Sequence, residues 1–164
     1  MKKADEITIR RANVNDIEAI AELETACFSA PWPLEVIYED LAIHKNLYYL
    51  VIKDDMAVGY AGMWMILDEA HINNVCIHPD YQGKGYGNRL VDFVIHEAYS
   101  QGADSLTLEV RAGNIRAQKL YARFGFIVEG IRKKYYEDNG EDAWIVPVST
   151  LLMHLRHCLR NTFS

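Results

Sequence analysis

The sequence predicts a single α/β domain with a mixed central β-sheet flanked by helices. Apolar, β-branched runs alternate with segments of helical period, a pattern typical of chains that combine strands and helices. Two apolar runs near the C-terminus are joined by Asp138-Asn139-Gly140, a strong signal for a β-hairpin. Neither a repeat nor a long linker divides the 164 residues, a length that one domain typically spans.

The N-terminal half predicts two helices and four strands. Asn13 is the expected cap of the first helix, because Asp16 follows three positions later as in a capping box. Pro33 suits the first turn of the second helix, since proline lacks the amide hydrogen that would be unpaired there. The expected strands lie at about residues 7–9, 47–53, 57–67 and 70–77.

The C-terminal half predicts two more helices and three strands. One helix ends near Gly102, and the next begins at Asn114 and ends at Gly125. Residues 1–152 form the expected domain. Residues 153–164 form a short tail, which is either an amphipathic helix, as its leucines and arginines suit, or frayed. The expected strands are 105–110, 126–136 and 143–152.

The composition argues against several classes of function. Seventeen basic and 23 acidic residues give a net charge of −6, which disfavours direct binding to nucleic acid. Cys27, Cys76 and Cys158 are far apart and the histidines lack ligand spacing, so we expect neither a metal site nor a disulfide framework. The N-terminus lacks the apolar core of a signal peptide, and no run approaches the ~20 apolar residues of a membrane span. We therefore expect a cytoplasmic protein that does not bind a membrane.

A glycine-rich turn at residues 82–87 separates an apolar strand from a helical segment. Closely spaced glycines leave backbone amides uncovered, and the following helix adds the positive end of its dipole, an arrangement that binds phosphate oxygens. The turn does not fit the Walker loop, because Gly85 follows Lys84 where Ser or Thr is needed. It does not fit the dinucleotide fingerprint either, because residue 88 is Asn. It fits the pattern Gln/Arg-x-x-Gly-x-Gly/Ala.

This pattern resembles the acetyl-CoA pyrophosphate loop of the GCN5-related N-acetyltransferases (GNAT). Residues 108–126 are similar to the same family in order and spacing, with Leu-Glu-Val-Arg followed by Asn-x-x-Ala-x-x-Leu-Tyr-x-x-Phe-Gly-Phe. Pro31-Trp32 and the Ile-Arg-x-x-Tyr-Tyr run at 131–136 resemble the branch that acetylates bacterial ribosomal proteins at an N-terminal alanine, the RimI type. The resemblance extends over about residues 7–148 and implies the GNAT fold.

The resemblance implies acetyl-CoA as cosubstrate and no metal. The backbone of Val75, Cys76 and Ile77 would pair with the pantetheine arm, and a main-chain N–H there would polarise the thioester carbonyl. Gln82 stands where many relatives have Arg, so its side chain would contribute less than the backbone amides of the loop. The other implied cofactor-binding residues are Gly83, Lys84, Gly85, Tyr86, Gly87, Asn88 and Asn114.

Glu109 and Tyr121 are the catalytic residues that the resemblance implies. Glu109 would be the general base, directly or through a water; the alternative is a surface carboxylate paired with Arg111 or a lysine. Tyr121 would protonate the departing CoA thiolate or hydrogen-bond to it, and the alternative is an ordinary core tyrosine. Asn114 lies two helical turns before Tyr121, and it is a cofactor contact, a helix cap or both.

The expected acceptor is the N-terminal α-amine of a protein. An α-amine titrates near ~8 and a lysine near ~10.4, so the neutral fraction of the α-amine at neutral pH is roughly a hundredfold larger. The acidic balance of the chain is compatible with a basic peptide such as the N-terminus of a ribosomal protein (S18-like). The residues expected by position to line the acceptor groove, each also compatible with ordinary packing, are Trp32, Leu34, Asn73, Tyr135 and Tyr136.

Two other functions stay open at the level of sequence. An enzyme of the same fold would acetylate a small-molecule amine or a protein lysine, and would be recognised by activity on those acceptors. A catalytically silent acyl-CoA-binding module would bind CoA, and substitutions at Glu109 and Tyr121 would have no effect on turnover.

Overall fold

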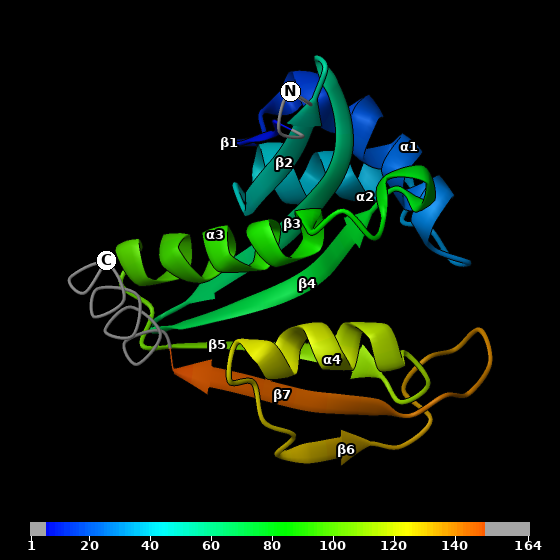
Figure 1. Ribbon diagram of the computed structural model, residues 1–164, viewed down its shortest axis with the longest axis vertical. Helices are drawn as coiled ribbons and strands as arrows, with labels where there is room; N and C mark the ends of the chain where they lie inside the picture. The colour runs from blue at the N-terminus through cyan, green and yellow to red at the C-terminus, as the bar shows by residue number, and fades with distance from the viewer. Residues whose placement is uncertain (1–5, 150–164) are drawn as a thin grey trace, which may run out of the picture. The chain divides into compact units, whose positions relative to one another are not determined.

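The computed structural model describes residues 6–149, so the expected tail at 153–164 lies outside the described residues. The described chain forms seven strands and four α-helices (Figure 1). The strands are β1 (Thr8–Arg11), β2 (Leu47–Lys53), β3 (Met56–Ile66), β4 (Glu69–Ile77), β5 (Ser105–Arg111), β6 (Gly130–Arg132) and β7 (Ala143–Ser149). The helices are α1 (Ile17–Cys27), α2 (Leu34–Tyr38), α3 (Tyr86–Ser100) and α4 (Ile115–Arg123).

The sheet is mixed, as the sequence predicts. Its strand order is β1-β2-β3-β4-β5-β7-β6. The β4–β5 pair is parallel, whereas β1–β2, β2–β3, β5–β7 and β6–β7 are antiparallel. The predicted fold class, a mixed sheet with helices, is therefore confirmed.

The chain divides into two compact units. Among the described residues, unit 1 comprises 6–63 and 74–90, and unit 2 comprises 64–73 and 91–149. Strands β3 and β4 each have residues in both units. The two strands are neighbours in the sheet.

Unit 1 has its apolar core between β1–β3 and the helices α1 and α2. The Asn13–Asp16 capping box is present: the Asn13 side chain accepts an N–H of the first turn, and the Asp16 carboxylate accepts the Asn13 N–H (2.8 Å). A 3-10 turn at Val14–Asp16 precedes α1, and α2 continues into a π-helical turn at Glu39–Ile43. The core residues are Ala12, Ile17, Ile20, Leu23, Ile37, Leu41, Tyr48, Leu50, Tyr60 and Cys76.

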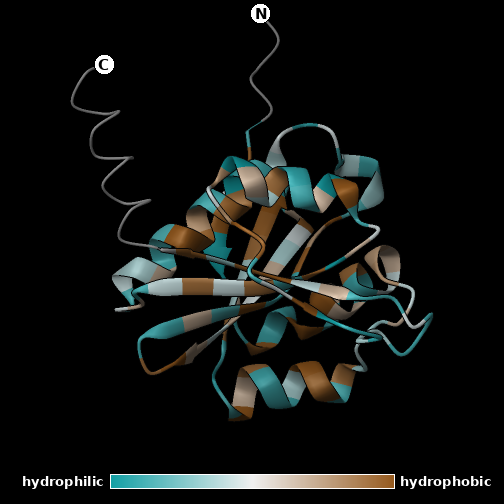
Figure 2. Ribbon diagram, turned by 90° about the horizontal axis from the view of Figure 1, so that it is seen from below, coloured by the Kyte–Doolittle hydropathy of each residue, from teal (hydrophilic) through white to brown (hydrophobic). Residues whose placement is uncertain are grey.

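Unit 2 is built on β5, β7 and β6, with α4 alongside them. Along β5 buried and partly exposed residues alternate, with Leu106, Leu108 and Val110 buried, which is the period of a strand covered on one face. Figure 2 shows teal and brown residues interleaved along the helices, as expected for elements with one buried side.

The expected strand at 126–136 is wrong in length, because only Gly130–Arg132 is assigned as strand. Pairing with β7 begins earlier, since the N–H of Glu129 donates to the carbonyl of Ile145 (2.9 Å). It stops after Arg132 because Lys134 adopts a φ of 50° and its N–H turns to the Asp142 carboxylate (3.0 Å). The tyrosines at 135 and 136 therefore belong to a loop and not to a strand.

Candidate functional site

The glycine-rich turn lies in unit 1, between β4 and α3. The Gln82 side chain donates a hydrogen bond to the carbonyl of Ile77 (2.9 Å), which fastens the turn to the end of β4. Gly83 and Gly85 have φ values of 77° and 82°, in the left-handed region that glycine adopts without strain. Gly87 already lies in the first turn of α3, where amides have no acceptor within the helix. The turn therefore presents N–H donors at the positive end of a 15-residue helix.

The edge of β4 that pairs with β5 is only partly used by the sheet. The parallel ladder ends at the Ile72–Leu108 pair, although β4 continues to Ile77. Within the described residues, the later part of β4 has no ladder with β5, so its backbone donors and acceptors on this edge suit an extended ligand. The residues expected to bind pantetheine lie in this stretch: Val75, Cys76 and Ile77.

A buried carboxylate in unit 1 holds the segment that contains Trp32. Glu24 on α1 is 1% exposed. It accepts hydrogen bonds from the Tyr60 hydroxyl and from the side-chain amide of Asn74 (2.8 Å). Its second oxygen accepts the backbone N–H of Trp32 (2.8 Å). Burial, followed by the charge of Glu24, raises the pKa of Tyr60 well above its usual value, so this phenol remains a donor.

Two cysteines far apart in the sequence meet beside this carboxylate. A hydrogen bond between the Cys27 and Cys76 thiols lowers the pKa of Cys27 and raises that of Cys76 well above its usual value. Cys76 is 7% exposed, which agrees with the buried thiol expected from its place in an apolar strand. The contact with Cys27 is not evident in the sequence, where 48 residues separate the two.

Glu109, the expected general base, lies in unit 2 near the end of β5 and is bonded on both sides. One carboxylate oxygen lies 2.8 Å from Nε2 of His71 on β4, and the other lies 3.6 Å from Nε of Arg132 on β6. The hydrogen bond from His71, followed by smaller effects that include the Arg132 charge, lowers the pKa of Glu109. The partner considered from the sequence, Arg111, is bonded elsewhere.

Tyr121, the expected general acid, lies on α4 and is 8% exposed. Its ring packs edge-on against Phe126, with centroids 5.5 Å apart. It lines a largely apolar cavity of about 330 Å³ together with Val110 and Trp144. Because successive side chains of a strand point to opposite faces, Val110 lies on the Tyr121 side of β5 and Glu109 lies on the other side.

Asn114 caps α4, which is one of the two roles expected for it from the sequence. Its side chain accepts the N–H of Ala117 (3.1 Å). This bond satisfies one of the unpaired amides of the first turn. The cofactor contact remains a prediction for this residue.

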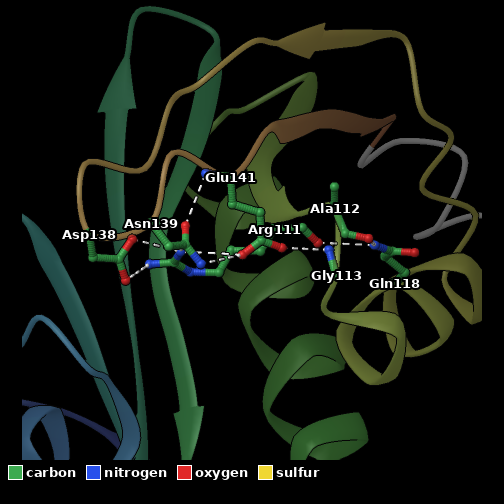
Figure 3. A network of polar contacts seen from close by, with 7 residues as sticks. All are labelled: Arg111, Ala112, Gly113, Gln118, Asp138, Asn139 and Glu141. Carbon is green, nitrogen blue, oxygen red and sulfur yellow. Dashed lines mark hydrogen bonds and ion pairs between the residues drawn. The ribbon is translucent and has the colours of Figure 1, made fainter.

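Arg111 anchors the loop that carries Tyr135 and Tyr136 (Figure 3). Its two terminal nitrogens lie 3.0 and 2.9 Å from the two carboxylate oxygens of Asp138, and one also contacts Glu141 (3.4 Å). The guanidinium stacks over the Tyr136 ring, 3.8 Å from its centroid. Burial raises the pKa of Tyr136 to about 12.

Glu141 and Gln118 extend this network to the start of α4 (Figure 3). The Glu141 carboxylate accepts the N–H of Gly113 (2.6 Å). The Gln118 amide donates to the carbonyls of Arg111 (3.0 Å) and Ala112 (2.8 Å). The end of β5, the N-terminus of α4 and the tyrosine loop are therefore one bonded assembly within unit 2.

The residues expected to line the acceptor groove differ in exposure. Leu34 and Tyr135 are 44% and 46% exposed, and Trp32 is partly buried against the core of unit 1. Both polar side-chain atoms of Asn73 are buried and, in the part of the chain that the structure describes, have no hydrogen-bond partner. A buried amide without a partner is costly in a folded protein unless a ligand satisfies it.

Five residues were not expected from the sequence, because each makes its contacts with residues that are distant along the chain. They are Glu24, Cys27, Asn74, His71 and Arg132. A glutamate within an otherwise apolar helix face was the available signal for Glu24. The contacts of His71 depend on the register of a parallel strand pair, which no local pattern specifies.

Residues 6–149 contain no group of three or more His, Cys, Asp or Glu side chains placed to hold a metal ion. None of the described helices combines the length and apolarity that crossing a membrane requires.

Comparisons with known proteins give consistent results. The sequence model of the acetyltransferase (GNAT) family matches residues 17–126. A Bacillus subtilis (strain 168) protein, provisionally named a ribosomal protein bS18-alanine N-acetyltransferase, is 40% identical over 86% of this chain and 94% of its own. The ribosomal protein bS18-alanine N-acetyltransferase of Escherichia coli (strain K12) is 33% identical over 87% of this chain and 98% of its own.

A solved structure gives the same result for the fold. The crystal structure of the ribosomal-protein-S18-alanine N-acetyltransferase from Escherichia coli aligns with a TM-score of 0.82 and 31% identity. The alignment covers 88% of this chain and 94% of that one.

Proposed function

The chain belongs to the acetyltransferase (GNAT) family and is an acetyl-CoA-dependent N-acetyltransferase, and we propose that its acceptor is the N-terminal α-amine of an alanine-starting protein. A ribosomal protein of the bS18 kind is the acceptor that its relatives' names favour. The observation that supports this most directly is the β4 edge beyond the Ile72–Leu108 pair, followed by a turn that presents N–H donors. An extended arm ending in a diphosphate needs these two features in succession.

The fit of acetyl-CoA to this edge is supported by the backbone. Val75 to Ile77 offer strand donors and acceptors to the amides of the arm. Gly85 has no atom within 4 Å of the position a Cβ would take, so the turn leaves room for phosphate oxygens against the main chain. Acetyl-CoA supplies a thioester, whose carbonyl carbon is open to attack by a neutral amine.

Glu109 and Tyr121 are the proposed groups for proton transfer. The attacking amine loses a proton on the Glu109 side, and the departing thiolate gains one, or a hydrogen bond, from the Tyr121 hydroxyl. Their placement on opposite faces of β5 follows from the alternation at Val110. The base acts on the amine nitrogen and the acid on the thiolate sulfur, so the two groups need not lie on the same side of the strand.

The α-amine is the acceptor that this chemistry favours. The pKa of Glu109 is lowered, so a lysine, protonated almost completely at neutral pH, would be difficult for it to deprotonate. The hydroxyls of Tyr135 and Tyr136 are available to the peptide backbone that follows the amine, and the buried amide of Asn73 lacks partners that such a backbone would supply. They are the proposed contacts of the acceptor, together with Trp32 and Leu34.

Acetyl transfer to defined peptides tests the proposal. The protein is incubated with acetyl-CoA and peptides that begin with Ala, Ser or Gly, or that carry a blocked N-terminus and an internal lysine, and mass spectrometry locates the added acetyl group. We expect acetylation at the α-amine, fastest on the alanine peptide. Tyr121→Phe should keep its affinity for CoA and lose turnover. Acetyl found only on lysine, or only on small-molecule amines, would refute the assignment.

A further inference from the structure

The carboxylate of Glu109 is too well satisfied to act as a base by itself. Its Oε2 accepts from Nε2 of His71 at 2.8 Å, and its Oε1 lies 3.6 Å from the Arg132 guanidinium. Both contacts stabilise the ionised carboxylate, and together with the other local effects they lower the pKa of Glu109. A carboxylate stabilised in this way has less tendency to take a proton from an amine.

His71 is the side chain that contacts Glu109 most closely. It lies on β4 next to β5, with its side chain 30% exposed and its ring beside Trp64 (centroids 6.3 Å apart). A carboxylate only accepts hydrogen bonds, so the 2.8 Å contact requires a proton on Nε2 of His71. In the neutral imidazole the lone pair then resides on Nδ1. Glu109 fixes this tautomer, as a carboxylate does for the histidine of a catalytic triad.

A second observation is an unpartnered side-chain amide close to His71 on the same strand. Asn73 lies two residues further along β4 and therefore points to the same face. Its buried carboxamide has no partner among the described residues, although both its donor and its acceptor atoms are inaccessible to solvent. A peptide amide bound there would satisfy these atoms and bring its amine to the side of the strand where His71 lies.

We propose that the general base is the His71–Glu109 pair, in which His71 takes up the proton of the amine and Glu109 orients and stabilises the resulting imidazolium. The proposal rests on the α-amine acetylation described above and deepens it. The amine nitrogen forms a bond to the acetyl carbonyl carbon, and the carbon–sulfur bond breaks. One proton passes from the nitrogen to Nδ1 of His71, directly or through a water, and the thiolate is protonated at the Tyr121 side.

His71→Gln is the main test, with His96→Gln as its matched control. Glutamine can still donate to Glu109, but it cannot take up a proton. His96 has the same 30% side-chain exposure and also lies near a carboxylate, that of Asp92 at 3.7 Å. We expect His71→Gln to lower kcat on the alanine peptide by about a hundredfold or more, with the KM for acetyl-CoA and the thermal midpoint unchanged. His96→Gln should retain wild-type kinetics.

The dependence of kcat/KM on pH tests whether His71 is a base or has only a structural role. In the wild type, kcat/KM should fall on the acid side, because protonation of Nδ1 of His71 removes the lone pair that accepts the proton. The charged groups that face His71 are Glu109 on β5 and, beyond it, Arg132 on β6. The ionisation of the peptide amine contributes equally to every variant. The amine therefore gives every variant an acid limb, which should become shallower in His71→Gln because the contribution of His71 is lost. Added imidazole should restore part of the activity of His71→Gly.

The possible results distinguish a failure of the role proposed for His71 from a failure of the proposed α-amine acetylation. A His71→Gln variant within about threefold of the wild-type kcat, with an unchanged acid limb, overturns the role of His71 and leaves Glu109 as sole base. A wild-type protein that acetylates no α-amine overturns the proposed function and the role of His71 together. Loss of activity accompanied by loss of CoA binding in calorimetry would assign His71 a structural role and also refute the proposal.

Discussion

Each unit of the molecule holds one aromatic segment by a polar network of its own, and the two networks are built in different ways. In unit 1, the buried Glu24 binds the backbone of Trp32 together with Tyr60 and Asn74. In unit 2, the Arg111 network binds Asp138 and stacks on Tyr136 near the surface, with Arg111 29% exposed. The first network has one ion and several neutral donors, whereas the second pairs ions of opposite charge.

The difference shows that burial and pairing are alternative ways of fixing a loop. A buried carboxylate is stabilised only while all its donors are in place, because water cannot replace a lost one. A partly exposed ion pair loses less when it is broken, since both groups regain water. We therefore expect substitutions in the Glu24 network to cost much stability, with little effect of salt. Substitutions in the Arg111 network should cost less stability, and salt should weaken its ion pair.

The largest expected effect is that of Glu24→Ala. The substitution leaves the Tyr60 hydroxyl, the Asn74 amide and the Trp32 N–H without their shared acceptor, and the Tyr60 hydroxyl is fully buried. We expect the free energy of unfolding to fall by about 3 kcal/mol, measured by urea denaturation followed by circular dichroism.

The control is Glu22→Ala on the same helix, where the side chain is exposed. It should change the free energy of unfolding by less than about 0.5 kcal/mol. If the Glu24→Ala protein does not fold, Glu24→Gln can be measured instead. Glutamine retains one acceptor oxygen, so the free energy of unfolding should fall less. Equal stability of the Glu24→Ala and Glu22→Ala proteins would show that the buried network does not hold unit 1 together.

The same contrast explains what the sequence could and could not predict. Local patterns identified the elements: the capping box at Asn13 and Asp16 is present, and β2 has the expected bounds. The motifs also located the glycine turn and the strand that carries Glu109. The partners of Glu24 and Glu109 could not be predicted, because Tyr60 and Asn74 are 36 and 50 residues from Glu24 and meet it only through tertiary packing.

The strand expected at 126–136 failed for a related reason. Its apolar and aromatic residues have the composition of a strand. In the structure the second half leaves the sheet, because Arg111 holds Tyr136 by stacking and Asp142 binds the N–H of Lys134. Long-range polar contacts therefore override local β-propensity in this loop.

An intermediate effect is expected for Arg111→Lys. Lysine keeps the charge but cannot bind both oxygens of Asp138 or lie flat on the Tyr136 ring. We expect a loss of about 1–2 kcal/mol in the free energy of unfolding, together with a raised KM for the peptide and an unchanged KM for acetyl-CoA. Peptide titrations of initial rate measure the second effect.

A double-mutant cycle with Asp138→Asn sharpens this prediction. The two substitutions should be less than additive, because each breaks the same pair of hydrogen bonds. Molar salt should weaken the wild-type pair and leave the energy lost on Glu24→Ala nearly unchanged. Full additivity would show that Arg111 acts through Tyr136 alone.

The smallest effect is expected for Lys133→Gln, although its ion pair is as short as that of Arg111. Nζ of Lys133 lies 3.0 Å from Asp142, against 2.9 Å for the pair between Arg111 and Asp138. The Lys133 side chain is 77% exposed, however, and a hydrated lysine gains little from such a contact. Asp142 also retains the N–H of Lys134 after the substitution. We expect the urea midpoint and the KM for the peptide to equal those of the wild type, and a measurable change in either would show that distance, and not burial, determines how firmly this loop is held.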